Sequence, residues 1–135
     1  PVPRVGDAGG GIDERCLAVF PGTTEALVES DLDGRPSAWP PVPEWAVLCG
    51  AERESDTSQV AWYATDPGIS RAEVFRTYER ALAAVGQTGR AQTGRAQTAE
   101  GEILTGVVAP EHSFWMETGR DLFRVTWAVD GEYAD

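Results

Sequence analysis

The stretch that decides the fold is DPGISRAEVFRTYERALAAVG, residues 66–86. It opens with a Pro and a Gly placed to reverse the chain, and Ser70 and Glu73 then form the S-x-x-E pattern of a capping box. Gly86 matches the residue that follows a helix C-cap. Behind the cap, apolar side chains recur at the spacing of one helical face: Val74, Phe75, Tyr78, Ala81, Leu82 and Val85. These signals predict an amphipathic helix over residues 70–86.

Segments with strand composition lie on both sides of this helix. Before it, AVLCGA (46–51) and QVAWYATD (59–66) predict two strands, with the polar run 52–58 as their turn. After it, three more strands are predicted in EILTGVVA (102–109), HSFWMET (112–118) and LFRVTWAV (122–129). This order indicates an α+β fold, an antiparallel sheet of four to six strands with the helix packed on one face. Most of the five tryptophans are expected in that helix–sheet interface.

The N-terminal third has weaker patterns. Residues 1–12 are rich in Pro, Gly and small side chains, which predicts a flexible tail or tether ahead of a single domain over residues 13–135. CLAVF (16–20) is short and apolar enough for a strand, and TTEALVES (23–30) suits one or two helical turns. Segment 31–45 holds four prolines. It is therefore expected to wrap over the core with its two tryptophans inward.

The pentad GRAQT occurs twice in tandem, at residues 89–93 and 94–98. Each copy contains a Gly, and a period of five matches neither a helix nor a strand. The tandem therefore predicts an extended loop between the helix and the next strand. Deleting one copy is then expected to leave the melting temperature nearly unchanged, since loop closure depends weakly on length.

Charge limits the possible partners. The chain has 22 acidic residues against 11 arginines, with no lysine, for a net charge of −11. Nucleic acid and anionic lipid are therefore disfavoured as partners. The sequence contains no run of about 18 apolar residues, so no transmembrane segment is predicted in this chain.

One region departs from this acidity. Residues 61–100 hold five arginines against four acidic residues, a balance of +1. Arg76, Arg80, Arg90 and Arg95 are the candidates there for a site that binds an anion or an acidic partner. The alternative is a solvated helix face on which Glu73 and Glu79 are local partners.

Cys16 and Cys49 are the two cysteines, and they are too far apart for a local metal or redox motif. The favoured interpretation is a disulfide that closes the Pro-rich loop, which implies an oxidising compartment and hence secretion or surface display. Two unpaired buried thiols are the alternative. For an exported protein, a signal peptide or a lipid-anchored cysteine is expected upstream of Pro1.

Catalytic signals are sparse. His112 is the only histidine, and Glu111 beside it would point to the opposite face of a strand, so no metal site is predicted. No motif predicts a nucleophile elbow, a phosphate loop or a cofactor. The sequence favours a non-enzymatic domain that binds a protein or a small ligand. The alternatives are an acidic intracellular inhibitor or immunity-type protein that binds a basic partner, and a small enzyme that uses a carboxylate or His112.

The strand, capped helix and glycine of AWYATDPGISRAEVFRTYERALAAVG (61–86), followed by a β-rich end, resemble small secreted or lipoprotein-type domains of actinobacteria. The resemblance covers about half of the chain. It implies an α+β fold and an extracytoplasmic location, either secreted or anchored at the cell surface. Such domains mostly have no assigned activity, so the resemblance implies no catalytic residue.

Overall fold

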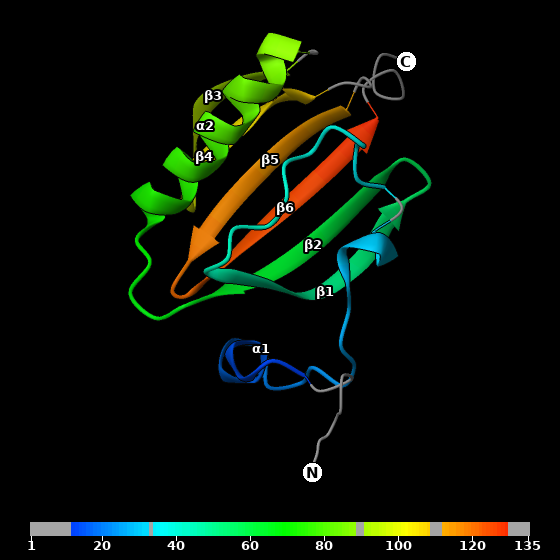
Figure 1. The fold of residues 1–135 in the computed structure, drawn as a ribbon, viewed down its shortest axis with the longest axis vertical. Helices are drawn as coiled ribbons and strands as arrows, with labels where there is room; N and C mark the ends of the chain where they lie inside the picture. The colour runs from blue at the N-terminus through cyan, green and yellow to red at the C-terminus, as the bar shows by residue number, and fades with distance from the viewer. Residues whose placement is uncertain (1–11, 33, 89–90, 109–111, 130–135) are drawn as a thin grey trace.

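The computed structural model describes residues 12–32, 34–88, 91–108 and 112–129. Its elements are α1 (Glu14–Val19), the 3-10 helix η1 (Glu29–Asp31), β1 (Ala46–Ser55), β2 (Ser58–Thr65), α2 (Arg71–Thr88), β3 (Ala91–Thr98), β4 (Gly101–Val108), β5 (His112–Gly119) and β6 (Leu122–Val129). The strands form one six-stranded antiparallel sheet (Figure 1). The predicted α+β fold is therefore confirmed. Except for Ile12, the predicted tail lies outside the described residues.

The chain crosses the sheet once. β1 and β2 form a hairpin, α2 then leads to β3 at the opposite edge, and β3, β4, β5 and β6 return as a meander (Figure 1). The meander ends when β6 pairs with β2, so the order is β1-β2-β6-β5-β4-β3. β1 and β3 are thus the two edge strands.

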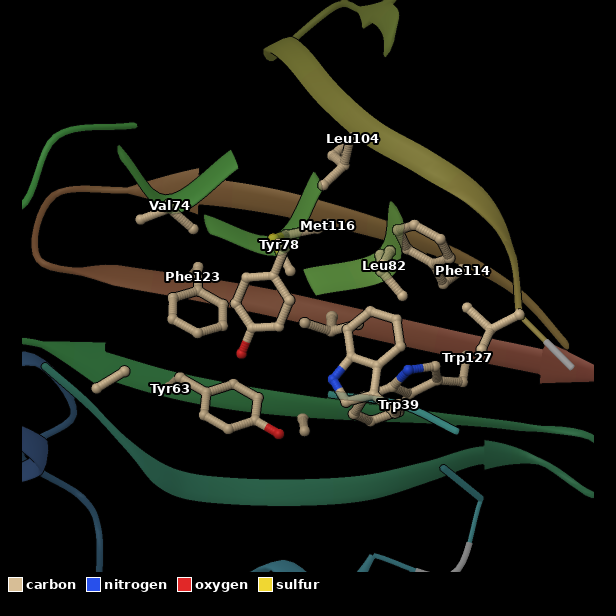
Figure 2. Packing of buried hydrophobic residues seen from close by; sticks show 14 of the residues in the cluster. Trp39, Tyr63, Val74, Tyr78, Leu82, Leu104, Phe114, Met116, Phe123 and Trp127 are labelled. Carbon is tan, nitrogen blue, oxygen red and sulfur yellow. The ribbon is translucent and has the colours of Figure 1, made fainter. Parts of the chain in front are cut away.

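The main core lies between α2 and one face of the sheet. Trp39, from the Pro-rich segment, packs at its centre: its ring centroid lies 5.6 Å from Tyr78, 5.1 Å from Phe114 and 5.2 Å from Trp127 (Figure 2). The side chain of Trp39 is only 6 % exposed, and Trp45 packs against the same cluster. The predicted wrap of this segment over the core is confirmed. Aromatic burial on this scale supplies much of the driving force for folding.

The start of α2 matches the prediction, but its end does not. The Ser70 hydroxyl accepts a hydrogen bond from the Glu73 amide at 3.1 Å, as a capping residue does. Gly86 was predicted to follow the helix, yet α2 continues to Thr88. A Cβ at Gly86 would lie 3.1 Å from the carbonyl oxygen of Ala91. Gly86 therefore allows β3 to approach the helix rather than ending it.

Three shorter predictions are wrong. Residues 16–20 were predicted as a strand but mostly form α1, whose N-cap is Asp13. Of residues 23–30, only the last two enter a helix, the 3-10 helix η1. The predicted turn over 52–58 is shorter, because β1 runs to Ser55 and β2 begins at Ser58.

The largest correction concerns the GRAQT tandem, because residues 91–98 form β3 rather than a loop. All eight residues pair with β4 in an unbroken antiparallel register from Ala91↔Val108 to Thr98↔Gly101. A repeat of odd length places its two copies on opposite faces of a strand. Accordingly, Ala91 packs against the main core while Ala96 is exposed. The backbone of the repeat pairs with β4, and this pairing does not require a periodic pattern of apolar side chains. The five-residue period therefore wrongly predicted a loop.

Candidate functional site

The candidate site lies on the sheet face opposite α2. Tyr63 and Phe114 are buried in the core beneath α2. Side chains alternate along a strand, so their neighbours Trp62 and Trp115 project from the opposite face, and both are partly exposed. These two are the exceptions to the prediction that most of the five tryptophans lie in the helix–sheet interface, which is confirmed. The three that belong to the main core are Trp39, Trp45 and Trp127.

A row of three side chains crosses the middle of this face. Trp62 on β2 is the register partner of Arg124 on β6, and Arg124 is the partner of Glu117 on β5. The Arg124 guanidinium donates to the Glu117 carboxylate. Their side chains are 40 % and 30 % exposed, so the pair is accessible to solvent and contributes little to stability.

Two grooves flank this row. The β4–β5 groove has a volume of about 700 Å³, and Ile103, Trp115, Glu117 and Arg124 are among its lining residues. The β1 groove has a volume of about 750 Å³ and lies between segment 19–27 and the β1–β2 hairpin. Trp62 lines the β1 groove, and it is the register neighbour of Arg124 in the other groove. The two grooves therefore adjoin at this pair.

The polar lining of the grooves is mainly acidic. Glu25 and Glu52 line the β1 groove, and Glu100 and Glu117 line the β4–β5 groove. Arg124 is the one cation among the lining residues, and Glu117 already neutralises it. Indole faces and carboxylates are both suited to binding cations. The chemistry of this face therefore favours a positively charged group over an anion.

The arginines predicted as an anion site are distributed differently. Arg95 donates to Glu79 at 2.9 and 3.0 Å and to Glu102 at 2.8 Å, and its guanidinium lies 4.7 Å from the Phe75 ring centroid. The hydrogen-bonded Glu79 raises the pKa of Arg95. Arg95 is thus part of an ion-pair network that joins α2 to β3 and β4.

Two of the other three arginines of that set lie on α2. Arg76 pairs with Glu73 at 3.5 Å, which matches the alternative of local partners. Arg80 is exposed on α2, and Arg90 lies outside the described residues. An anion site at Arg76, Arg80 and Arg90 stays a prediction.

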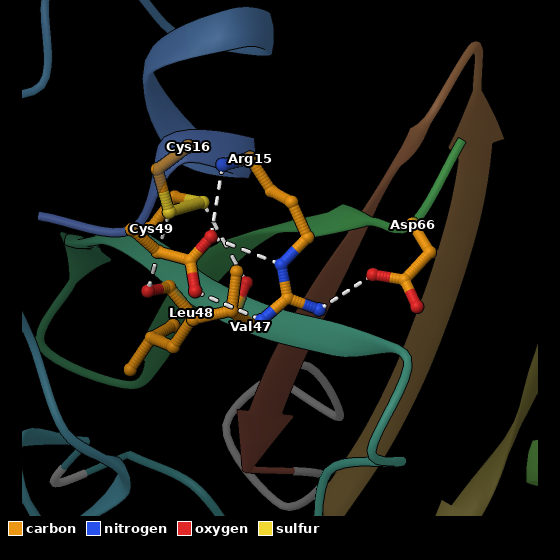
Figure 3. Close-up of polar contacts among 7 residues, drawn as sticks. Arg15, Cys16, Val47, Leu48, Cys49 and Asp66 are labelled. Atoms are coloured by element: carbon orange, nitrogen blue, oxygen red, sulfur yellow. Dashed lines mark hydrogen bonds and ion pairs between the residues drawn. A yellow bond between two sulfur atoms is a disulfide. The ribbon is translucent and has the colours of Figure 1, made fainter.

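The cysteines lie together as predicted. The Sγ atoms of Cys16 and Cys49 are 2.09 Å apart, and the bridge fastens α1 to β1 (Figure 3). Arg15 adds a second fastening, because it donates to Asp13 at 2.8 and 2.9 Å and to Asp66 at 2.8 Å (Figure 3). This hydrogen bonding lowers the pKa of the Asp13 carboxyl. These two contacts hold α1 in place at the start of segment 19–27, which forms one wall of the β1 groove.

A half-buried acidic group was missed by the sequence reasoning. Glu29 in η1 forms an ion pair with Arg35, and burial raises the pKa of its carboxyl despite that partner. Burial also raises the pKa of the Tyr63 and Tyr78 phenols, which lie close enough to interact with Glu29. This cluster anchors the Pro-rich segment over the core.

No metal-binding cluster of three His, Cys, Asp or Glu occurs among the residues that the structure describes. His112 begins β5 and is half-buried. None of the helices in the described part of the chain has the length and hydrophobicity that a membrane span requires.

Comparisons with protein-family models, with curated proteins and with solved structures found no match to this chain. Neighbouring aromatic residues were the sequence signal for this face. In Trp62–Tyr63 and Phe114–Trp115, adjacent strand residues are both aromatic, so each strand must carry one large ring on each face.

Proposed function

We propose that this chain is an extracytoplasmic, non-enzymatic binding domain whose two grooves hold a basic segment of a partner protein. The observation that carries the proposal is the meeting of the two grooves at Trp62 and Arg124 on the face opposite α2. Together they form one path across the sheet, and such a path suits an extended segment.

The choice of a basic partner follows from charge. Four carboxylates line the grooves, and the chain as a whole carries a net charge of −11. A field of one sign steers an oppositely charged partner toward the surface and rejects acidic ones. Trp62 and Trp115 add ring faces on which guanidinium groups can stack.

The compartment rests on the disulfide. A bridge between Cys16 and Cys49 persists in oxidising surroundings and is rare in the reducing cytosol. This supports secretion or surface anchoring, in line with the resemblance to secreted domains. Thiol titration of protein from its native source, denatured without reductant, should find no free thiol. Two titratable thiols would contradict the proposed location.

The binding proposal is tested with an oligoarginine peptide as the probe. Tryptophan fluorescence and calorimetry should both report binding at low ionic strength, and added salt should weaken it. The variant Glu100→Gln removes a groove carboxylate and should weaken binding about two- to fivefold. Glu44→Gln is the matched control, because Glu44 is an exposed carboxylate outside both grooves.

Three outcomes would overturn the proposal. One is no binding of oligoarginine at low salt. Another is an equal loss in both variants, which would indicate attraction by net charge alone. The third is saturable binding of a neutral oligosaccharide without a response to oligoarginine, which would assign the indole rings to sugar stacking.

A further inference from the structure

β3 is an edge strand without the usual protection. It is the last strand of the sheet, its eight residues pair with β4 without a register shift, and six of them in succession are exposed. The other edge differs, because β1 has register shifts at Leu48/Gly50 and Arg53/Ser55 and bears charged side chains at 52–54. Bulges and charges block edge-to-edge pairing, and a long regular edge invites it.

The free backbone groups of this edge can be assigned. Thr98 and Gly101 are register partners that close a two-residue turn, so they form a hydrogen-bonded pair. Alternation along β3 then directs the backbone groups of Gln92 toward β4 and those of Thr93 and Arg95 outward. The close approach of β4 agrees, since a Cβ on Gly106 would lie 2.0 Å from the Gln92 carbonyl oxygen.

The side chains of β3 do not obstruct the edge. Its sequence is AQTGRAQT, with no proline and a single charged residue, Arg95. Arg95 is turned onto α2, where Glu79 and Glu102 neutralise it. The tandem pentad thus produces a strand that is polar enough to stay soluble and that keeps its outward amides accessible.

We infer that β3 pairs with β3 of a second copy of this chain, in antiparallel orientation about a twofold axis at Gly94. This register joins Thr93 to Arg95 of the partner subunit, and Ala91 to Gln97 of the partner subunit. Thr93 and Arg95 have outward backbone groups, so each of their two pairs supplies hydrogen bonds, whereas the carbonyl of Ala91 lies against Gly86 of α2. The register also keeps the two Arg95 side chains from lying directly opposite, where like charges would repel.

Charge distinguishes this edge from the rest of the molecule. α2 and β3 together hold four arginines and two glutamates, a balance of +2. The whole chain carries −11, so its other residues carry −13. Two copies that meet where β3 and α2 lie therefore do not bring the acidic remainder of each chain together. The inference does not depend on the proposed function of the grooves.

The first test is the molar mass measured by sedimentation over about a hundredfold concentration range, because dimerisation follows mass action. The wild-type mass should rise from 14.5 kDa toward twice that value. Thr93→Pro removes an outward amide at an edge position and should remain a monomer. Thr93→Ala keeps the amide and should still dimerise. A wild-type protein that stays monomeric throughout, or a dimer that survives Thr93→Pro, overturns the inference.

Hydrogen exchange of the wild-type protein tests the same geometry without relying on a variant that folds. The inward amides of Gln92, Gly94 and Ala96 should be protected at every concentration. The outward amides of Thr93 and Arg95 should gain protection only as dimer accumulates. Outward amides that exchange as fast at high as at low concentration overturn the inference.

Discussion

Deleting one GRAQT pentad is expected to destabilise the protein by about 3 kcal/mol. Removal of 89–93 or of 94–98 gives the same chain, because the copies are identical. Only residues 89 and 90 separate the end of α2 from the start of β3, so the connection holds no spare length. The five missing residues must therefore come from α2 or from β3.

The less disruptive rearrangement takes them from α2. The QT at 87–88 then replaces the QT at 92–93 opposite β4, and the helix ends near Ala83. Half-buried Val85 leaves the helix and its partial burial is lost, at a cost of about 1 kcal/mol, and the lost helical hydrogen bonds add about 0.5 kcal/mol each. Released chain entropy offsets part of this sum. A net loss of about 3 kcal/mol lowers the melting temperature of a domain of this size by about 10 °C.

Thermal and urea unfolding, followed by circular dichroism, measure this loss. Insertion of a third GRAQT copy is the matched control, because it uses the same residues but adds length, which should cost only about 1 kcal/mol. If the deletion variant melts within about 2 °C of the wild type, the pentads form a loop after all and the assignment of β3 is refuted.

Three further predictions concern the close packing of β4 on β3, the disulfide and the half-buried Glu29. Gly106→Ala should lower the free energy of unfolding by about 2 kcal/mol or more, measured in urea, since its Cβ would overlap a carbonyl of β3. Gly94→Ala should be tolerated, because the nearest atom to its Cβ lies at 3.9 Å. Equal stabilities of the two variants would contradict this prediction. Replacing Cys16 and Cys49 by Ser should cost about 4 kcal/mol for a separation of 33 residues, and a loss below about 1 kcal/mol would show that the bridge does not constrain the unfolded chain. Folding raises the pKa of Glu29, so the stability of the wild-type protein should fall as pH rises from the ordinary pKa of a Glu through that raised pKa. Glu29→Gln should flatten this fall; an unchanged slope would exclude Glu29 as its cause.

The fold was predictable where local and long-range preferences agree. In α2 the capping residues, the apolar face and the tight packing of Phe75, Tyr78 and Leu82 all favour a helix. All five strands predicted after residue 45 combine apolar residues with buried positions, and they pair in the sheet as β1, β2, β4, β5 and β6. Sequence patterns are reliable under that agreement.

The pentads show why the rest was not predictable. The dipeptide QT occurs at 87–88, 92–93 and 97–98, where it ends α2 in the first case and lies in β3 in the other two. Identical residues thus take two backbone conformations, so the difference comes from pairing with β4 and not from local propensity. The N-terminal α1 was missed for a similar reason, because its one buried residue, Cys16, is held by a bridge to β1.

The grooves could not be predicted from local sequence patterns, because the residues that line them are as far apart in the sequence as Phe20 and Arg124.

The cysteine pair was predictable, since two cysteines allow only one intramolecular bridge. Arg95 was identified as a notable residue, but its partners Glu79 and Glu102 come from α2 and β4. Which charges pair with one another depends on the register, and no spacing in the sequence specifies it.

The geometry of the edge connects the two proposals. A twofold axis that pairs β3 with its copy in antiparallel orientation stands perpendicular to the sheet, so equivalent faces of both subunits point the same way. The face opposite α2 would then be continuous across the dimer. Thr98 on β3 lines the β4–β5 groove, which places that groove beside the shared edge in each subunit. A partner with two basic segments would bind the β4–β5 groove of each subunit. Once its first segment is bound, the second binds at the high effective concentration of a tethered ligand. A regular edge at β3, whose one charge is paired, and an acidic face next to it are therefore compatible, because pairing at the edge doubles the binding face without covering it.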